Sequence, residues 1–255
     1  MNKVDLIEKL IPCILQAGKK IMEIYDLVPK KTFKPDGSPV TEADKAAEKI
    51  ILADLKRIVP DIPIVSEENP DSHSNTSTDK YFLVDPLDGT KEFLKQDGKG
   101  SFTVNIGLIE NKIPVMGIIY APALNRLFCG CNEYGAWEVL NNTKKQLSVR
   151  IPKSHNIIAV ASISHKDQET TDWLTKRKIN NTISVGSSLK FCLVASGEAD
   201  VYPRFGPTME WDTAAGDAIL RAAGGLVTNP DLSNLIYGKP HYKNNHFIAW
   251  GGYKE

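Results

Sequence analysis

The N-terminal part of the chain carries two helical patterns of apolar positions. Between residues 3 and 27, apolar side chains recur three or four residues apart, which places them on one face of an amphipathic helix. The same spacing predicts a second helix over residues 41–58, and Pro60 ends it because proline cannot continue a helix. The segment 34–39 between the two patterns is rich in proline and glycine and predicts a turn or loop.

Short apolar runs then replace the helical spacing. They predict strands at 63–66 and 81–84, and the polar segment 69–79 between them predicts a surface loop. Further strands, separated by turn signals, are predicted at 102–109, 113–120, 126–131 and 135–139. A run of consecutive strands of this kind is typical of a meander-like sheet.

Beyond Pro152 the pattern changes to alternating strands and helices. The predicted strands are 157–162, 182–185, 199–202 and 246–250, and the predicted helices are 167–178, 188–196 and 212–223. Such alternation is typical of an α/β arrangement. We therefore divide the chain into an N-terminal α+β half, residues 1–152, and a C-terminal α/β half, residues 153–255, which together form one compact unit.

The composition excludes several classes of protein. Lys and Arg total 31 and Asp and Glu also total 31, whereas a binding surface for a nucleic-acid polymer needs a basic excess. No stretch reaches the roughly 18 apolar residues of a membrane span, and the N-terminus lacks the apolar core of a signal peptide, so we expect a cytoplasmic protein. The cysteines lack zinc-site spacing and predict buried, reduced thiols at Cys13, Cys129, Cys131 and Cys192.

The segment 85–90, Asp-Pro-Leu-Asp-Gly-Thr, follows directly on a predicted buried strand. Its turn can bring two carboxylates and the carbonyl oxygen of Leu87 to one point, and Gly89 allows a ligand to approach the backbone closely. Thr90 opens a predicted helix, and free N–H groups at a helix start bind anions. The alternative is a simple turn in which an aspartate caps the next helix. The segment alone does not decide between the two.

Four other acidic residues have ordinary local interpretations. Glu67 and Glu68 lie at a strand end and point to opposite sides, so one of them can face a metal site, although such pairs are usually solvated surface. Asp212 is a good N-cap for the helix that follows it. Asp44 fits a capping box with Thr41.

Together the acids indicate a metal site. Glu67, Asp85, Asp88 and Asp212 would repel one another severely if they met without cations. Ligands that are all oxygen favour Mg²⁺ or Ca²⁺ over zinc or copper. Several Mg²⁺ ions beside a phosphate-binding helix start suit the attack of water on a phosphoryl group. The sequence contains no P-loop motif that would indicate another phosphate chemistry.

The combination of motifs resembles the lithium-sensitive, magnesium-dependent phosphomonoesterase superfamily of inositol monophosphatases, fructose-1,6-bisphosphatases and 3′(2′),5′-bisphosphate nucleotidases. The motifs are Ser-Pro-Val-Thr-Glu-Ala-Asp44, Val-Ser-Glu-Glu-Asn69, Asp-Pro-Leu-Asp-Gly-Thr90 and Trp-Asp-Thr-Ala-Ala-Gly216. Within this superfamily, these motifs, with the third continued as Asp-Gly-Thr-Lys-Glu-Phe93, resemble the CysQ-type nucleotidases most closely. Inositol monophosphatases usually carry Asn-Phe where this chain has Glu-Phe.

The resemblance implies a layered αβαβα fold and two or three Mg²⁺ ions in each active site. The first ion would bind Glu67, Asp85 and the Leu87 carbonyl, the second would bind Asp85, Asp88 and Asp212, and Glu67 would help to hold a weaker third through water. Thr90 and Asp44 would orient and deprotonate the attacking water, with Glu67 assisting. The residues implied to contact the substrate are Glu67, Leu87, Asp88, Gly89, Thr90 and Asp212, with the phosphate held by the N–H groups of Gly89 and Thr90.

The resemblance further implies that the substrate is adenosine 3′,5′-bisphosphate, which is hydrolysed to AMP and phosphate as in sulfate assimilation. The segment 186–188, Lys190 and Arg204 could meet the second phosphate or the adenosine, or the two basic residues could be solvated surface charge. An inositol monophosphatase and a regulatory, non-catalytic relative are the alternatives. The sequence leaves open the oligomeric state, the sulfated nucleotide as substrate, and a peripheral association with the inner membrane.

Overall fold

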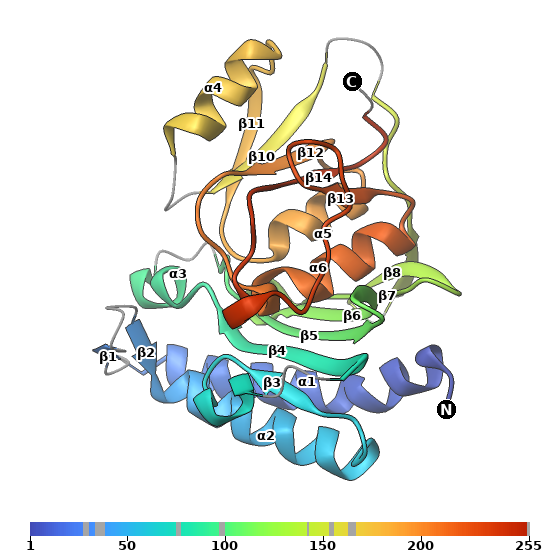
Figure 1. The fold of residues 1–255 in the computed structure, drawn as a ribbon. Helices are drawn as coiled ribbons and strands as arrows, with labels where there is room; N and C mark the ends of the chain where they lie inside the picture. Colours follow the sequence, from blue (N-terminus) through green and yellow to red (C-terminus); the bar gives the residue numbers. More distant parts are fainter. Residues whose placement is uncertain are drawn as a thin grey trace.

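The structure is a computed structural model that describes residues 1–27, 31–33, 39–74, 78–96, 100–141, 143–152, 156–162 and 167–253. Helices and sheets alternate in layers: α1 and α2, a seven-stranded sheet, α5 and α6, a five-stranded sheet, and α4 on the outside (Figure 1). The predicted αβαβα arrangement is therefore confirmed.

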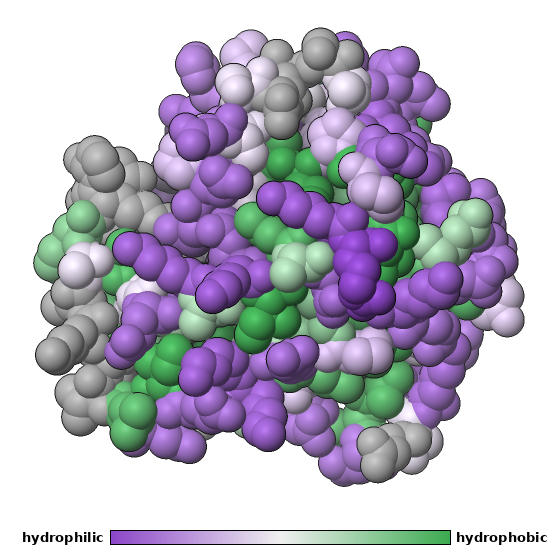
Figure 2. All heavy atoms as spheres, turned by 90° about the horizontal axis from the view of Figure 1, so that it is seen from below, coloured by the Kyte–Doolittle hydropathy of each residue, from purple (hydrophilic) through white to green (hydrophobic). Residues whose placement is uncertain are grey.

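The first layer contains α1 (Lys3–Tyr25) and α2 (Glu42–Ile58), close to their predicted bounds. In each helix the apolar side chains, such as Ile7 in α1 and Ile51 in α2, recur at helical spacing and so form one face. This face is buried against the large sheet. On the face seen from below in Figure 2, hydrophilic residues predominate and hydrophobic residues form smaller patches between them. Part of the predicted loop 34–39 lies outside the described residues, and next to it β1 (Lys31–Phe33) and β2 (Pro39–Thr41) form a small antiparallel pair.

The seven-stranded sheet has the order β3-β4-β5-β6-β7-β8-β9, in which only β3 and β4 run parallel among neighbours. The strands are β3 (Ile64–Ser66), β4 (Lys80–Asp88), β5 (Thr103–Glu110), β6 (Ile113–Ala121), β7 (Arg126–Cys131), β8 (Gly135–Leu140) and β9 (Thr143–Leu147). The predicted meander is confirmed from β4 onward. Short 3-10 turns lie at Pro70–Ser74 (η1) and Pro122–Leu124 (η2).

The C-terminal part places α5 (Leu189–Ala195) and α6 (Glu210–Ala222) between the two sheets. The second sheet has the order β11-β10-β12-β14-β13. Its strands are β10 (Ile158–Ser162), β11 (Asn181–Val185), β12 (Val201–Arg204), β13 (Leu226–Thr228) and β14 (Phe247–Trp250), and α4 (Gln168–Lys176) and the turn η3 (Pro240–Tyr242) complete the elements.

Small residues let α6 lie directly on the large sheet. A Cβ atom on Gly117 of β6 would come within 2.1 Å of the carbonyl oxygen of Ala215, and one on Gly107 of β5 would come within 2.8 Å of the Cβ of Ala214. Gly216 is packed in the same way against the ring of Phe191 in α5. This close packing seats the second turn of α6 on β5 and β6, and the first turn extends to the end of β4.

Two predicted boundaries near this point were wrong. Strand β4 does not end at Val84 but continues to Asp88, with an irregularity in its pairing to β5 between Asp85 and Asp88. Pro86 has no N–H to contribute to the ladder, and it is accommodated here because the pairing is interrupted at this bulge. Helix α6 begins at Glu210, so Asp212 lies inside its first turn and is not the N-cap.

The cysteines are all buried and free, as predicted. No helix in the described parts of the chain combines the length and the apolar character needed to cross a membrane.

Candidate active site

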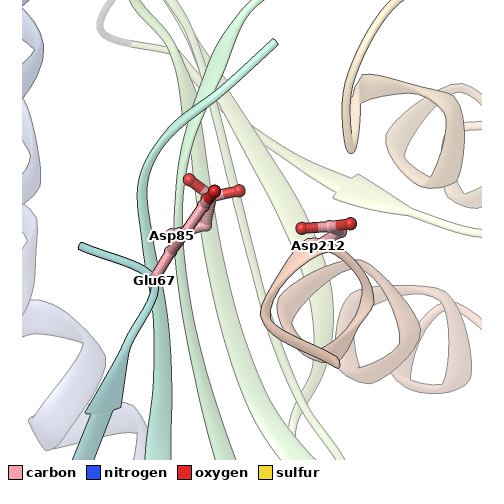
Figure 3. A group of neighbouring side chains, drawn as sticks. All are labelled: Glu67, Asp85 and Asp212. Atoms are coloured by element: carbon pink, nitrogen blue, oxygen red, sulfur yellow. The ribbon is translucent and has the colours of Figure 1, made fainter. Parts of the chain in front are cut away.

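Three carboxylates from three separate elements meet at the end of β4. Glu67 follows β3, Asp85 lies at the bulge of β4, and Asp212 lies in the first turn of α6 (Figure 3). One oxygen of each carboxylate lies within 4.8 Å of the oxygens of the other two. The structure therefore brings together three of the four acids that the sequence predicted to converge.

Glu67 is presented by a turn and not by the strand itself. The N–H of Asn69 donates to the carbonyl of Ser66 (3.1 Å), and the N–H of Glu67 donates to the carbonyl of Val84 (3.1 Å). Glu67 and Glu68 thus occupy the two central positions of a tight turn, which differs from the predicted strand end. The turn directs the carboxylate of Glu67 toward Asp85 (Figure 3).

The segment 85–90 folds on its own polar groups. Asp85 Oδ1 accepts a hydrogen bond from the N–H of Leu87 (3.0 Å) within the irregular part of β4. Gly89 has a φ of +91°, which glycine adopts without strain, and a Cβ there would lie 3.1 Å from the carbonyl oxygen of Ser101. Gly89 is then the N-cap of the short helix α3 (Thr90–Lys95), so the predicted helix start at Thr90 is confirmed.

Asp212 combines capping with a position in the cluster. Its Oδ2 accepts a hydrogen bond from the N–H of Met209 (2.8 Å), so it caps α6 from the third helical position. This contact holds the carboxylate at the helix end that faces β3 and β4 (Figure 3).

Asp88 lies beside the three-carboxylate cluster and is turned toward Ser188. Asp88 Oδ2 accepts hydrogen bonds from the N–H (2.6 Å) and the hydroxyl (2.7 Å) of Ser188, and the amide of Asn105 lies 3.5 Å away. Asn105 also donates to the Ser188 hydroxyl (2.8 Å), which lies 2.7 Å from the carbonyl oxygen of Asp212. Asn105 was not predicted as a site residue, although an amide within the otherwise apolar run 102–109 was a usable signal.

The electrostatics of the cluster call for cations. Burial raises the pKa of Asp85 well above its usual range, and the charges of Glu67, Asp88 and Asp212 raise it further. Burial likewise raises the pKa of Asp212, with Asp88 and Glu67 adding to the shift. Carboxylates this close cannot all remain ionised unless positive charge is supplied. Because the donors are all oxygen, hard cations such as Mg²⁺ fit them best.

Asp44 joins the helix cap to the candidate site. Its Oδ2 accepts hydrogen bonds from the N–H (2.8 Å) and hydroxyl (2.7 Å) of Thr41, which completes the predicted capping box. Its Oδ1 accepts one from the hydroxyl of Thr90 (3.3 Å), which also lies 3.3 Å from the carbonyl oxygen of Leu87. Burial raises the pKa of Asp44, and the charge of Glu68 adds to the shift. Asp44 therefore has both a structural contact and the contact expected of a proton acceptor.

A sequence profile described as the Inositol monophosphatase family matches residues 4–251. The chain belongs to the inositol monophosphatase family. Within this family it is similar to the 3′(2′),5′-bisphosphate nucleotidase CysQ of Salmonella typhimurium, with 47% identity over 91% of this chain and 94% of that protein. The CysQ of Escherichia coli strain K12 is 44% identical over 87% of this chain and 89% of its own length.

Solved structures of family members agree with the fold. The crystal structure of CysQ from Bacteroides thetaiotaomicron has a TM-score of 0.84 and 40% sequence identity, and it covers 99% of this chain and 98% of that chain. An IMPase of Thermotoga maritima has a TM-score of 0.80 at 24% identity, covering 97% and 92% of the two chains, and supports the fold alone.

In this family member, a cavity of about 230 Å³ adjoins the carboxylates. Its lining includes Glu67, Asp88 and Asp212 together with the basic residues Lys190 and Arg204. The side chain of Lys190 donates to the carbonyl of Ser187 (2.6 Å), and its ammonium lies 5.3 Å from the centre of the Tyr202 ring. The segment 186–188, which the sequence associated with the substrate, is divided, since Gly186 and Ser187 line the cavity while Ser188 faces Asp88.

The two basic residues are not solvated surface charge, which was one of the alternatives. Lys190 is 6% exposed and Arg204 is 7% exposed. Burial lowers the pKa of Lys190 to about 8, against the opposing effect of Asp88. Arg204 donates to the carbonyl of Pro207 (3.1 Å), and its Nε is buried without a hydrogen-bond partner among the described residues. Anionic partners stabilise buried cations of this kind, and an anionic group of a substrate in the cavity would be such a partner.

The contact between Thr90 and Asp44 gives a first testable prediction. Thr90→Val removes the hydroxyl and preserves the shape of the side chain. We expect kcat to fall about 100-fold, the lower end of the contribution of general acid–base catalysis, because the group that orients the water beside Asp44 is lost. Mg²⁺ affinity should change little, because the predicted ligands remain. The measurement is kcat together with the Mg²⁺ concentration that gives half-maximal rate. Thr90→Ser keeps the hydroxyl and serves as the matched control, and a Thr90→Val enzyme as fast as the wild type would remove Thr90 from the mechanism.

Proposed function

We propose that this family member is a Mg²⁺-dependent 3′(2′),5′-bisphosphate nucleotidase that hydrolyses adenosine 3′,5′-bisphosphate to AMP and phosphate. The observation that carries the proposal is that one cavity is lined both by Glu67, Asp88 and Asp212 and by two buried basic residues, Lys190 and Arg204. A substrate with two phosphates matches this distribution of charge, because one phosphate can meet metal ions at the acids while the other meets the cations. The printed names of the CysQ relatives support the same substrate class.

The carboxylates would hold the metal ions in the predicted sets. Glu67, Asp85 and the Leu87 carbonyl would form one site, and Asp88 and Asp212 would join Asp85 in the second. Bound Mg²⁺ would neutralise charge on the phosphoryl group and lower the pKa of a water molecule. We propose two or three ions in each active site.

The chain's own residues would prepare the attacking water. The hydroxyl of Thr90 would orient it, and Asp44, whose buried carboxylate has a raised pKa, would accept its proton more readily than an ordinary carboxylate. Glu67 would hold a water bound to the weaker third ion. The N–H groups of Gly89 and Thr90 would hold the phosphate. Because Gly89 has no side chain and adopts a left-handed conformation, the phosphate could approach the backbone closely there.

Phosphate release from adenosine 3′,5′-bisphosphate and from inositol 1-phosphate, measured in parallel with Mg²⁺, tests this proposal. We expect a higher kcat/KM for the nucleotide, since inositol 1-phosphate offers no second phosphate to Lys190 and Arg204. The sulfated nucleotide belongs in the same assay as a third substrate. Preference for inositol 1-phosphate would contradict the substrate assignment, and the absence of turnover on all three would favour the regulatory relative.

Inhibition by lithium is a further expected result. The resemblance to lithium-sensitive phosphatases predicts that Li⁺ in the millimolar range displaces one Mg²⁺ and slows turnover. The measurement is the initial rate on the nucleotide at fixed Mg²⁺ with increasing LiCl. An equal concentration of NaCl controls for ionic strength, and equal rates in the two salts would contradict the prediction.

We also propose that the chain consists of two halves, residues 1–152 and 153–255, and that the protein is cytoplasmic. The large sheet lies wholly before residue 152 and the small one after it, which supports two halves, while residues 153–155 at the boundary lie outside the described residues. Contacts between Ala215 and the large sheet support one compact unit. We retain a cytoplasmic location and a small nucleotide, not a nucleic-acid polymer, as the partner.

A further inference from the structure

His73 lies between the two segments that carry Glu67 and Asp212. Its Nε2 is 2.8 Å from the carbonyl oxygen of Ser66, the residue before Glu67. Its ring is stacked on the indole of Trp211, the residue before Asp212, with ring centroids 4.9 Å apart and an angle of 24° between the planes. One side chain therefore contacts the direct neighbours of two residues of the carboxylate cluster, although those residues belong to different layers of the fold.

The contact with Ser66 belongs to a well-bonded support. The hydroxyl of Ser72, next to His73 in η1, accepts from the N–H of Ser66 (3.0 Å) and donates to the carbonyl of Asn69 (2.6 Å). Since a carbonyl only accepts, Nε2 of His73 must carry the proton in this contact. η1 is thus fastened to both ends of the turn that presents Glu67.

On the other side, packing alone holds the indole of Trp211. The ring is 5% exposed, and its Nε1 is buried without a hydrogen-bond partner among the described residues. Tyr242 contacts the indole with centroids 6.1 Å apart, and His73 supplies the stacked contact. Because no hydrogen bond fixes the indole, the loss of the imidazole would let Trp211, and with it the first turn of α6, shift.

We propose that His73 is a positioning residue that sets the separation of the Glu67 and Asp212 carboxylates, and through it the affinity of the candidate site for divalent cations. Mutual repulsion pushes these carboxylates apart, and His73 ties their two segments together. The inference rests on the metal site of the proposed function but not on the identity of the substrate. Support of this kind around metal ligands commonly determines affinity.

Binding of Mn²⁺, a paramagnetic substitute for Mg²⁺, tests this role of His73 without catalysis. In the full chain, His73→Ala is expected to weaken Mn²⁺ binding about tenfold, measured from the electron paramagnetic resonance signal of the free ion. His73→Phe keeps a ring on Trp211, and His73→Gln keeps a donor for Ser66, so each should recover part of the loss. In turnover assays, the Mg²⁺ concentration for half-maximal rate should rise while kcat at saturating Mg²⁺ changes little.

Ile14→Val is the matched control for general loss of stability. Ile14 of α1 is fully buried against the face of the large sheet that is covered by α1 and α2. The substitution should lower the midpoint of thermal unfolding without changing Mn²⁺ affinity. Wild-type Mn²⁺ affinity in a folded His73→Ala variant would overturn the proposal, and so would an equal loss of affinity in Ile14→Val. A wild-type protein that turned over the nucleotide but bound no Mn²⁺ would overturn the proposed role of His73 and leave the substrate assignment in place.

Discussion

Replacing Asp85 by asparagine is expected to abolish phosphatase activity and to leave the fold intact. Asp85 lies within 4.8 Å of both Glu67 and Asp212, and its pKa is raised by burial and by the charges of Glu67, Asp88 and Asp212. It also belongs to both predicted metal sites. We expect kcat/KM to fall by more than the roughly 10–100-fold loss typical of residues that only support metal ligands.

The fold should survive because asparagine keeps the local contact. Its side-chain oxygen can still accept from the N–H of Leu87, as Asp85 Oδ1 does at 3.0 Å. Without metal, the variant should unfold at an equal or higher temperature than the wild type, since one of several buried, mutually repelling carboxylates is gone. With Mg²⁺, the wild type should gain stability and the variant should gain much less.

The measurements are kcat/KM and the midpoint of thermal unfolding with and without Mg²⁺. Asp61→Asn provides the matched control, because Asp61 is exposed in the turn after α2 and lies before β3, at the opposite end of that strand from Glu67. It should behave as the wild type in both assays. Near-normal turnover by Asp85→Asn would contradict the assignment of both metal sites.

Local periodicity predicted the helices and most strands because the pattern itself reports which face is buried. Ile7 and Ile14 in α1 recur at helical spacing and are fully buried. Strand β9 was missed because Thr143–Leu147 is almost entirely polar and exposed, so pairing with β8 alone gives it its shape. The three-residue strand β13 is too short to show any period.

The candidate site was predictable only as far as its motifs were local. The turn of residues 85–90 and the cap of Asp44 follow from neighbouring residues, and both are present. The orientation of Asp88 toward Ser188 depends on a contact between distant parts of the chain, which no local pattern reveals. The burial of Lys190 has the same origin, since it depends on how α5 packs between the sheets.

Lys190→Met is expected to weaken the enzyme specifically toward substrates with a second phosphate. Methionine preserves the length and apolar stem of lysine, so the packing beside Tyr202 is retained while the charge is lost. One hydrogen bond to a charged group contributes about 1.5–3 kcal/mol. KM for adenosine 3′,5′-bisphosphate should therefore rise about 10–100-fold, whereas KM for adenosine 3′-monophosphate should change little.

The pH dependence of KM separates this role from a structural one. The pKa of Lys190 is lowered to about 8 by burial, so its ammonium is charged below that pH and loses its proton above it. Binding of the second phosphate needs the charged form, and KM for the bisphosphate should rise as the pH increases through about 8. The monophosphate should show no such rise, and Lys190→Met should remove it for the bisphosphate as well.

The same variant also tests whether the charge of Lys190 affects Mg²⁺ binding by the acids of the cavity. Loss of the Lys190 charge leaves Asp88 and Asp212 with less compensating charge, so Mg²⁺ should bind as tightly as before or more tightly. Lys176→Met, on the exposed surface of α4, is the control for charge alone and should leave both KM values unchanged. An equal rise of KM for the bisphosphate and the monophosphate would contradict the assignment, because it would place Lys190 at the phosphate that is cleaved.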